Sequence, residues 1–250
     1  MKIAATTAVL LTLSAAFQVQ PAARQGGATS KVRIYADQAH GQAPLIDPYT
    51  ALAAKLGAEF VGSSAPITAQ SLSGYRLLVL RVPTTEIKAD ERAAIVDFVR
   101  KGGSLLLAFD EERRAPLSTT GVNDLIVPFG MKLTDDTEYL HNNGAIAKKG
   151  AIHAADREVP FSGGRAVEGG TPFAWQLDKD GKPAQVFAAS TTVGTTGRVV
   201  VLGDAMTTLF LGTPEGVRLT GVPRDPTRTT YWGKDSAIFM EEMVAWLIKK

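Results

Sequence analysis

The 250-residue sequence contains no cysteine. Disulfide bonds, cysteine nucleophiles and cysteine-ligated metals are therefore excluded. Two other catalytic signatures are also missing. No serine stands in the Gly-x-Ser-x-Gly turn of a nucleophile elbow, and no glycine-rich loop carries the lysine of a phosphate-binding loop. The sequence thus predicts no cofactor and assigns no metal.

Neither sign of charge dominates the chain. Lysine and arginine number 27 against 25 acidic residues, which gives a formal net charge of +2. No basic stripe with interleaved aromatic residues is present, so we expect no nucleic-acid partner. The apolar share of 45% and the charged share of 21% are ordinary for a globular protein.

Long apolar runs are missing except at the start of the chain. There, Lys2 precedes the uncharged run Ile3–Phe17, the pattern of a secretory signal peptide. A membrane span needs roughly 20 apolar residues, so cleavage is expected and a retained anchor is the alternative. We predict a signal peptide over residues 1–23, a linker over 24–30, and a mature chain without a membrane span that is periplasmic or secreted.

The remaining residues, 31–250, are expected to form one α/β domain. Buried strands are predicted from short apolar or β-rich runs at Lys31–Tyr35, Glu59–Val61, Leu77–Val82, Ser104–Phe109 and Gly197–Leu202. Helices are predicted after Asp47, which could cap a helix with Pro48 in its first position, and at Ala89–Lys101 and Ser236–Ile248. This alternation favours a doubly wound, mostly parallel sheet with helices on both faces.

The middle of the sequence is less regular. A short helix is predicted over Val122–Phe129, followed by a loop-rich β insertion with short antiparallel strands between about residues 134 and 170. Two further strands, Phe173–Leu177 and Gln185–Ala189, are expected to flank a turn at residues 178–181.

Two segments carry a family resemblance. They are "YRLLVLRVP" with "IKADERAAIVDFVRKGGSLLLAFD", ending at Asp110, and "GRVVVLGD" at Gly197–Asp204 before the last helix. Together with "ADQAHGQ" at Ala36–Gln42, they resemble the GldG/IFT52-type and DUF4350-like branch of the class I glutamine-amidotransferase-like domains. The resemblance covers roughly residues 31–250. It implies a flavodoxin-like fold and a binding or scaffold role beside cell-envelope or carbohydrate-active proteins. The catalytic cysteine of the amidotransferases is missing, so glutaminase activity is not expected.

Candidate site residues follow from a rule for open α/β sheets, in which ligands bind beyond the carboxyl ends of the strands. The candidates for catalysis at those ends are Asp37, His40, Asp110 and Asp204. Carboxylates and a histidine at one edge could bind a metal or act as a general base on water. The alternative is structural, because an aspartate after a strand often caps a helix or closes a turn.

Candidates for ligand binding are His40, Gly41, Arg81, Glu111, Tyr231 and Trp232. An exposed Tyr231–Trp232 pair would suit a sugar or a protein partner, whereas a packed pair would anchor the last helix. The other two histidines, His141 and His153, have no metal-ligand spacing and are expected to be solvated loop residues.

Three functions remain open at this stage, and the third of them, a soluble component of an exporter or motility complex, would show an exposed apolar patch larger than a few hundred Å². The first is an exported, non-catalytic binding or scaffold module of the cell envelope, with an envelope protein or a carbohydrate as its partner. The second is a metal- or water-using hydrolase with its site at the carboxyl ends of the strands. Four catalytic candidates around one metal or water would favour the hydrolase, and scattered or capping positions would favour the binding module.

Overall fold

The computed structural model describes residues 31–41, 46–136, 144–161, 163–209 and 234–249. The predicted signal peptide and linker, His141, Tyr231 and Trp232 lie outside these ranges. Within the described residues no helix is both long and apolar enough to cross a membrane.

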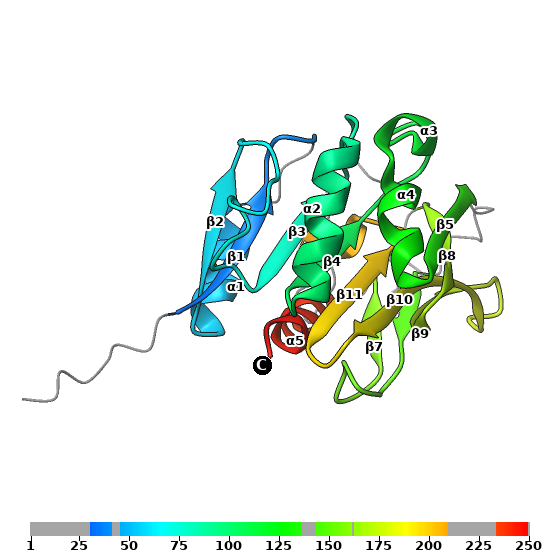
Figure 1. Cartoon of the computed structure of the whole chain (residues 1–250). Coiled ribbons are helices and arrows are strands. Elements are labelled where there is room, and N and C mark those ends of the chain that lie inside the picture. Colours follow the sequence, from blue (N-terminus) through cyan, green and yellow to red (C-terminus); the bar gives the residue numbers. More distant parts are fainter. Residues whose placement is uncertain (1–30, 42–45, 137–143, 162, 210–233, 250) are drawn as a thin grey trace, which may run out of the picture. The chain divides into compact units, whose positions relative to one another are not determined.

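Five parallel strands form one half of the main sheet (Figure 1). They are β1 (Val32–Asp37), β2 (Ala58–Ser63), β3 (Leu77–Arg81), β4 (Ser104–Ala108) and β11 (Gly197–Leu202), and they stand in the order β2-β1-β3-β4-β11. The chain moves from β1 to one side and from β3 to the other, so the topological switch point lies between β1 and β3. The predicted flavodoxin-like α/β class is confirmed.

Four antiparallel strands extend this sheet beyond β11 to nine strands. Their order is β10 (Pro183–Val193), β9 (Thr171–Leu177), β6 (Ala145–Ala147) and β7 (Arg157–Val159). Part of the predicted β insertion therefore joins the main sheet. The rest, β5 (Met131–Asp136) and β8 (Arg165–Gly169), forms a separate antiparallel pair.

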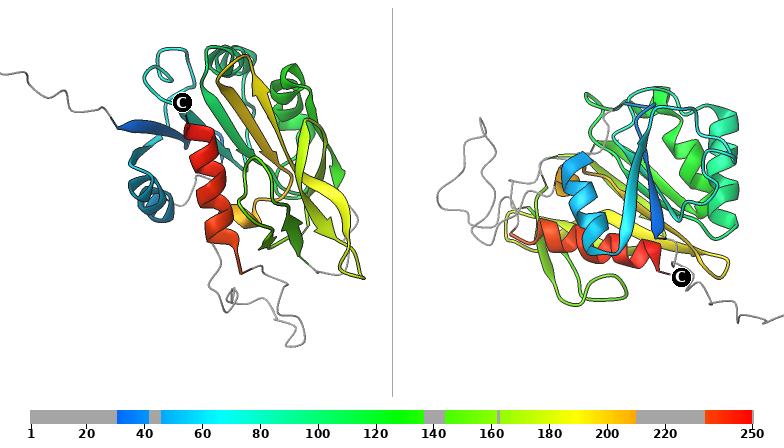
Figure 2. Two further views of the ribbon diagram at one scale, coloured as in Figure 1. Left: turned by 90° about the horizontal axis from the view of Figure 1, so that it is seen from below. Right: turned by 90° about the vertical axis from the view of Figure 1, so that its left-hand side faces the viewer.

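Helices cover both faces of the sheet (Figure 2). The long helices are α1 (Ile46–Lys55), α2 (Ala89–Arg100) and α5 (Ser236–Ile248), and the short ones are α3 (Leu117–Thr120), α4 (Val122–Ile126) and the 3₁₀ turns η1 (Val127–Phe129) and η2 (Met206–Leu209). Helices α2 and α4 lie on one face, and α1 and α5 lie on the other. Helix α1 begins at Ile46, so Asp47 lies inside its first turn and does not precede it.

The core lies between these helices and the central strands. Every residue of β3 and β4 is buried, as expected for strands covered on both faces. The polar exception at the start of β4 is Ser104, whose hydroxyl donates to the carbonyl of Leu247 at 2.7 Å. This bond satisfies a carbonyl in the last turn of α5 that has no partner within the helix.

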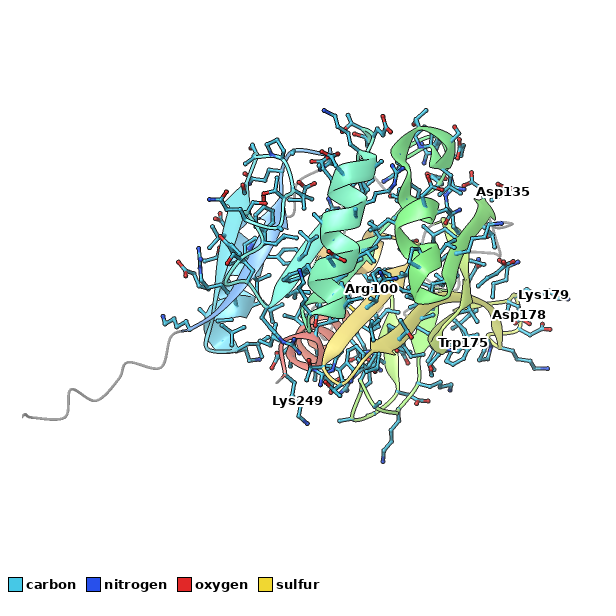
Figure 3. The ribbon with its side chains drawn as sticks, viewed as in Figure 1. Arg100, Asp135, Trp175, Asp178, Lys179 and Lys249 are labelled. Atoms are coloured by element: carbon cyan, nitrogen blue, oxygen red, sulfur yellow. The ribbon has the colours of Figure 1, made fainter. Side chains whose placement is uncertain are left out.

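The turn predicted between the last two antiparallel strands is confirmed. Asp178 accepts the backbone N–H groups of Asp180 and Lys182, both at 2.9 Å, and the strands on either side are β9 and β10. Figure 3 shows Asp178 and Lys179 on the surface, and because β9 runs in the same direction as β11, this turn lies at the same edge of the sheet as the carboxyl ends of the parallel strands.

Candidate functional site

The carboxyl ends of the parallel strands carry the residues that the sequence placed there. Asp37 ends β1, Arg81 ends β3, and Asp110 and Asp204 follow β4 and β11 by two residues each. All four are buried. Helix α2 begins at the same edge, because it follows β3 after a short loop (Figure 1).

Asp37 closes the turn after β1. Its Oδ1 accepts the backbone N–H of Ala39 at 3.1 Å, and its Oδ2 accepts that of His40 at 3.2 Å. This is the structural role weighed for an aspartate after a strand. The same carboxylate also contacts the imidazole of His40, with Nδ1 at 3.1 Å from both of its oxygens.

The second ring nitrogen of His40 contacts a residue of α2. Nε2 lies 3.0 Å from Oε2 of Glu91, and the exposed fractions of His40 and Glu91 are only 5% and 4%. The hydrogen bond with Asp37 raises the pKa of His40 above its ordinary value of 6.5, and the Glu91 carboxylate adds to this effect against the opposing effect of burial. The imidazolium is therefore the form that the two carboxylates stabilise.

Glu91 is itself held by the backbone. Its Oε1 accepts the N–H of Ile67 at 2.9 Å, and its Oε2 accepts the N–H of Lys88 at 3.0 Å. Burial opposes the ionisation of Glu91, but these amides and His40 outweigh it and lower the pKa of the carboxyl. Glu91 was not among the site residues predicted from the sequence. Its place three residues after Lys88 is a capping-box position, and that was the available signal.

The backbone around His40 is unusually constrained. The carbonyl of His40 accepts the N–H of Thr84 at 2.7 Å, and Gly41 forms an isolated bridge with Pro83. Gly41 has φ 133°, and a Cβ there would lie 2.6 Å from the Thr84 nitrogen. Gly41 therefore permits a close approach of two backbones. Val82, directly after β3, has φ 46°, an outlier for a β-branched residue.

A pocket of about 580 Å³ opens beside this network, and we name it the His40 pocket. It lies between the loop after β2, the loop after β3 and the first turn of α2. Besides His40 and Glu91, its polar lining consists of Ser64, Thr68, Thr85, Glu86, Lys88 and Asp90. The pocket is adjacent to the topological switch point, where open α/β sheets bind their ligands.

Asp110 belongs to a different group of charges. Its Oδ1 accepts the N–H of Glu111 at 2.9 Å, and its Oδ2 lies 3.5 Å from Nη1 of Arg114. Burial raises the pKa of Asp110, although Arg114 and Arg81 oppose this effect. Arg81 donates its Nε–H to Thr208 at 2.8 Å. Glu111 pairs with Arg113 and Arg114.

The predicted catalytic candidates are therefore divided. Asp37 and His40 contact each other, but no hydrogen bond or ion pair between described residues joins either of them to Asp110. Asp204 is buried after β11. Across the described ranges, no group of three or more His, Asp or Glu side chains is arranged to hold a metal ion.

Arg165 on β8 was not predicted and holds the loop after β4 in place. Its exposed fraction is 1%, and it donates to the carbonyls of Asp110 at 2.9 Å and Thr134 at 3.0 Å. A third contact joins it to the Glu112 carboxylate. A single arginine thus fixes the backbone at Asp110, and the sequence offered no signal because its partners lie far along the chain.

The prediction of a solvated His153 is wrong. Its exposed fraction is 1%, because its ring stacks on Phe239 with centroids 4.7 Å apart and also contacts Phe173. Its Nδ1 lies 3.0 Å from Oε2 of Glu242, a carboxylate that also accepts two hydrogen bonds from Arg157. Burial lowers the pKa of His153. This histidine is a packing residue beneath α5.

Comparisons with solved structures agree with the α/β fold. No family model and no curated protein matches the sequence. Among solved structures, the mmIFT52 N-terminal domain has a TM-score of 0.52 at 16% identity, over 70% of this chain and 86% of that one. A cytoplasmic protein from Salmonella typhimurium has a TM-score of 0.51 at 10% identity, over 87% and 97%. A protein described as a GMP synthase component, from Thermoplasma acidophilum, has a TM-score of 0.48 at 10% identity, over 87% and 94%. Such low identities show the fold alone.

Proposed function

We propose that this chain is an exported, non-catalytic binding or scaffold module of the cell envelope, and that its ligand enters the His40 pocket. One observation carries the non-catalytic part of the proposal. Both ring nitrogens of His40 have a carboxylate partner within 3.1 Å. A general base needs a neutral nitrogen within reach of the proton that it removes. His40 offers none, and its raised pKa favours the protonated ring.

The network around His40 instead has a positioning role. Glu91 joins three segments, since it contacts His40 after β1, Ile67 after β2 and Lys88 before α2. Every charged group in this network has a partner of opposite charge or a backbone donor, the condition under which a buried polar network gives rigidity. A rigid wall suits a binding pocket, because less ordering entropy is lost on binding.

The lining of the His40 pocket favours a neutral, hydroxyl-rich ligand such as a carbohydrate. Three hydroxyl side chains, Ser64, Thr68 and Thr85, lie beside charged groups of both signs, including Lys88 and Asp90. Such groups donate and accept hydrogen bonds from sugar hydroxyls. The described lining residues include no phenylalanine, tyrosine or tryptophan, so hydrogen bonds would supply most of the recognition.

A thermal-shift and calorimetry screen against neutral cell-wall and storage oligosaccharides tests this proposal. A ligand of the native state raises the melting temperature. The variants Lys88→Ala and Asp90→Ala are expected to abolish the shift, and Asp97→Ala, on the same helix but outside the pocket, is the matched control. Failure of every oligosaccharide to bind, or binding that survives both pocket variants, would contradict the proposed ligand class.

The hydrolase alternative has one observation in its favour. Burial raises the pKa of Asp110, which follows the central strand β4, and a carboxyl that holds its proton more tightly is better suited to act as a general acid. The variant Asp110→Asn distinguishes the two functions. Hydrolysis of a glycoside or ester substrate that disappears in this variant, with an unchanged melting temperature, would replace the binding module by an enzyme.

A further inference from the structure

A second pocket, of about 410 Å³, lies at the opposite end of α2 from the His40 pocket. It is formed by the last turns of α2, Gly102–Gly103 and the segment before β3. We name it the Phe98 pocket. The two pockets have no lining residue in common, although Ala69 of this pocket directly follows Thr68 of the His40 pocket in the chain.

The floor of the Phe98 pocket is apolar. Leu72 is buried, Phe98 and Tyr75 are half-buried, and Ala94 lies one helical turn before Phe98. The ring of Phe98 occupies the space above Gly103, where a Cβ would lie 2.4 Å from the ring. The absence of a side chain at Gly103 therefore permits the ring of Phe98 to lie against the backbone.

The charged groups of this pocket carry an excess of positive charge. Arg76 donates to two carbonyls, those of Thr196 at 2.9 Å and Lys249 at 2.7 Å, and neither neutralises its charge. Its Nε has no hydrogen-bond partner among the described residues. Lys101 has Asp97 at 4.0 Å, a distant pair between exposed side chains that contributes little. Figure 3 shows two further basic residues, Arg100 and Lys249, at this end of the molecule.

We propose that the Phe98 pocket binds the carboxyl-terminal residue of a partner polypeptide whose last side chain is apolar. The apolar side chain would contact Leu72, Ala94 and Phe98, and the terminal carboxylate would face Arg76 and Lys101. In a terminal residue the side chain and the carboxylate share one Cα, so a single residue supplies both. A pocket lined mainly by apolar side chains, with a small number of precisely placed polar groups, is typical of a selective binding site.

Fluorescence anisotropy with a labelled hexapeptide, Gly-Gly-Ser-Gly-Gly-Phe, tests the proposal on the full chain. The free-acid peptide is expected to bind, and its C-terminal amide to bind at least about tenfold more weakly, since it lacks the charge that strengthens the hydrogen bonds. Equal binding of acid and amide, or no binding of the acid at millimolar concentration, would overturn the proposal.

Two variants locate the binding. Lys101 is exposed, with a side-chain exposure of 76%, so Lys101→Glu leaves the fold intact and is expected to weaken the free-acid peptide about tenfold or more. Lys132→Glu, an exposed lysine on β5 outside both pockets, is the matched control and is expected to leave binding of the peptide unchanged. Binding of N-acetylphenylalanine is measured separately. If it binds as tightly as the peptide, the pocket would be assigned to small apolar acids, and the proposal of a polypeptide partner would be overturned. The oligosaccharide test of the His40 pocket uses a different ligand and different variants, so failure of one proposal is distinguishable from failure of the other.

Discussion

Nε2 of His40 lies 3.0 Å from Oε2 of Glu91, although the two residues are 51 positions apart in the sequence. This contact fixes the start of α2 against the turn after β1. It places an imidazolium between two buried carboxylates, so one ring joins the turn after β1 to the first turn of α2.

Replacement of His40 by alanine leaves Asp37 and Glu91 without their shared cation. Loss of one partner in a buried charge pair costs about 3–5 kcal/mol of unfolding free energy. We expect a loss of that order in urea denaturation of His40→Ala. In the double variant with Glu91→Gln, the loss should be smaller than the sum of the single losses, since contacting residues are not additive. Additive losses would show that the two side chains do not interact.

The two buried histidines should give opposite pH dependences. The pKa of His40 is raised, so its contribution to stability is complete below its ordinary pKa of 6.5 and is lost as the pH rises through the folded value. The pKa of His153 is lowered, so its contribution is complete above 6.5 and is lost as the pH falls.

Glutamine variants at the two positions measure these contributions. The difference in unfolding free energy between the wild type and His40→Gln should shrink from about pH 5 to about pH 8.5, the range in which histidine titrates. The difference for His153→Gln should grow over the same range. Glu242 and Arg157, the charged groups that face His153, stay in place in both variants. Parallel pH profiles for the two variants would contradict the assignment.

Gly41 and Gly57 form a matched pair of glycines with positive φ. Gly57 has φ 68°, and a Cβ added there would have no atom within 4 Å. Gly57→Ala should therefore lower the free energy of unfolding by only about 1–2 kcal/mol. Gly41→Ala adds a clash with the Thr84 backbone at 2.6 Å and should cost about 3 kcal/mol or more. Thermal unfolding of the two variants measures the difference. Equal costs would mean that the backbone near Thr84 moves freely.

Val82 tests whether strain is stored after β3. Glycine is ordinarily less stable than alanine in a strand by about 0.5–1 kcal/mol. At φ 46° this order should reverse, because glycine accepts a positive φ and alanine does not. We expect Val82→Gly to be at least as stable as Val82→Ala in chemical denaturation, although both lose buried apolar area. A clearly less stable glycine variant would argue against strain.

Expression of the full chain in a bacterial host tests the prediction of a cleaved signal peptide. Cleavage after Ala16 or after Ala23 is expected, and N-terminal sequencing of the protein from the periplasm or the medium would identify the new terminus. A protein that retains Met1 and fractionates with membranes would support the retained anchor.

Local sequence patterns predicted the parts of the fold that depend on neighbouring residues. Helix α5 and strand β11 have the predicted bounds, because each has its own periodicity or apolar run. The antiparallel half of the sheet was predicted only in outline. Strands β6 and β7 have three residues each, too few for a period-2 pattern. Their place in the main sheet is decided by pairing with β9, far along the chain.

The candidate site shows the same division. The strand-end rule placed Asp37 and His40 correctly at the carboxyl edge, but it could not show that Glu91 would meet them. That contact depends on how α2 packs, which no local pattern contains. The prediction for His153 was wrong for the same reason. Its neighbours in the sequence are typical of a loop, whereas the rings that bury it, Phe173 and Phe239, come from distant segments of the chain.

One segment of chain forms a wall of both pockets. Ser64 and Pro66–Thr68 line the His40 pocket, and the next residue, Ala69, together with Leu72–Arg76, lines the Phe98 pocket. A ligand that displaces this segment at one end therefore changes the other pocket as well. Thermodynamic linkage makes any such effect reciprocal, so each ligand alters the affinity of the other by the same factor.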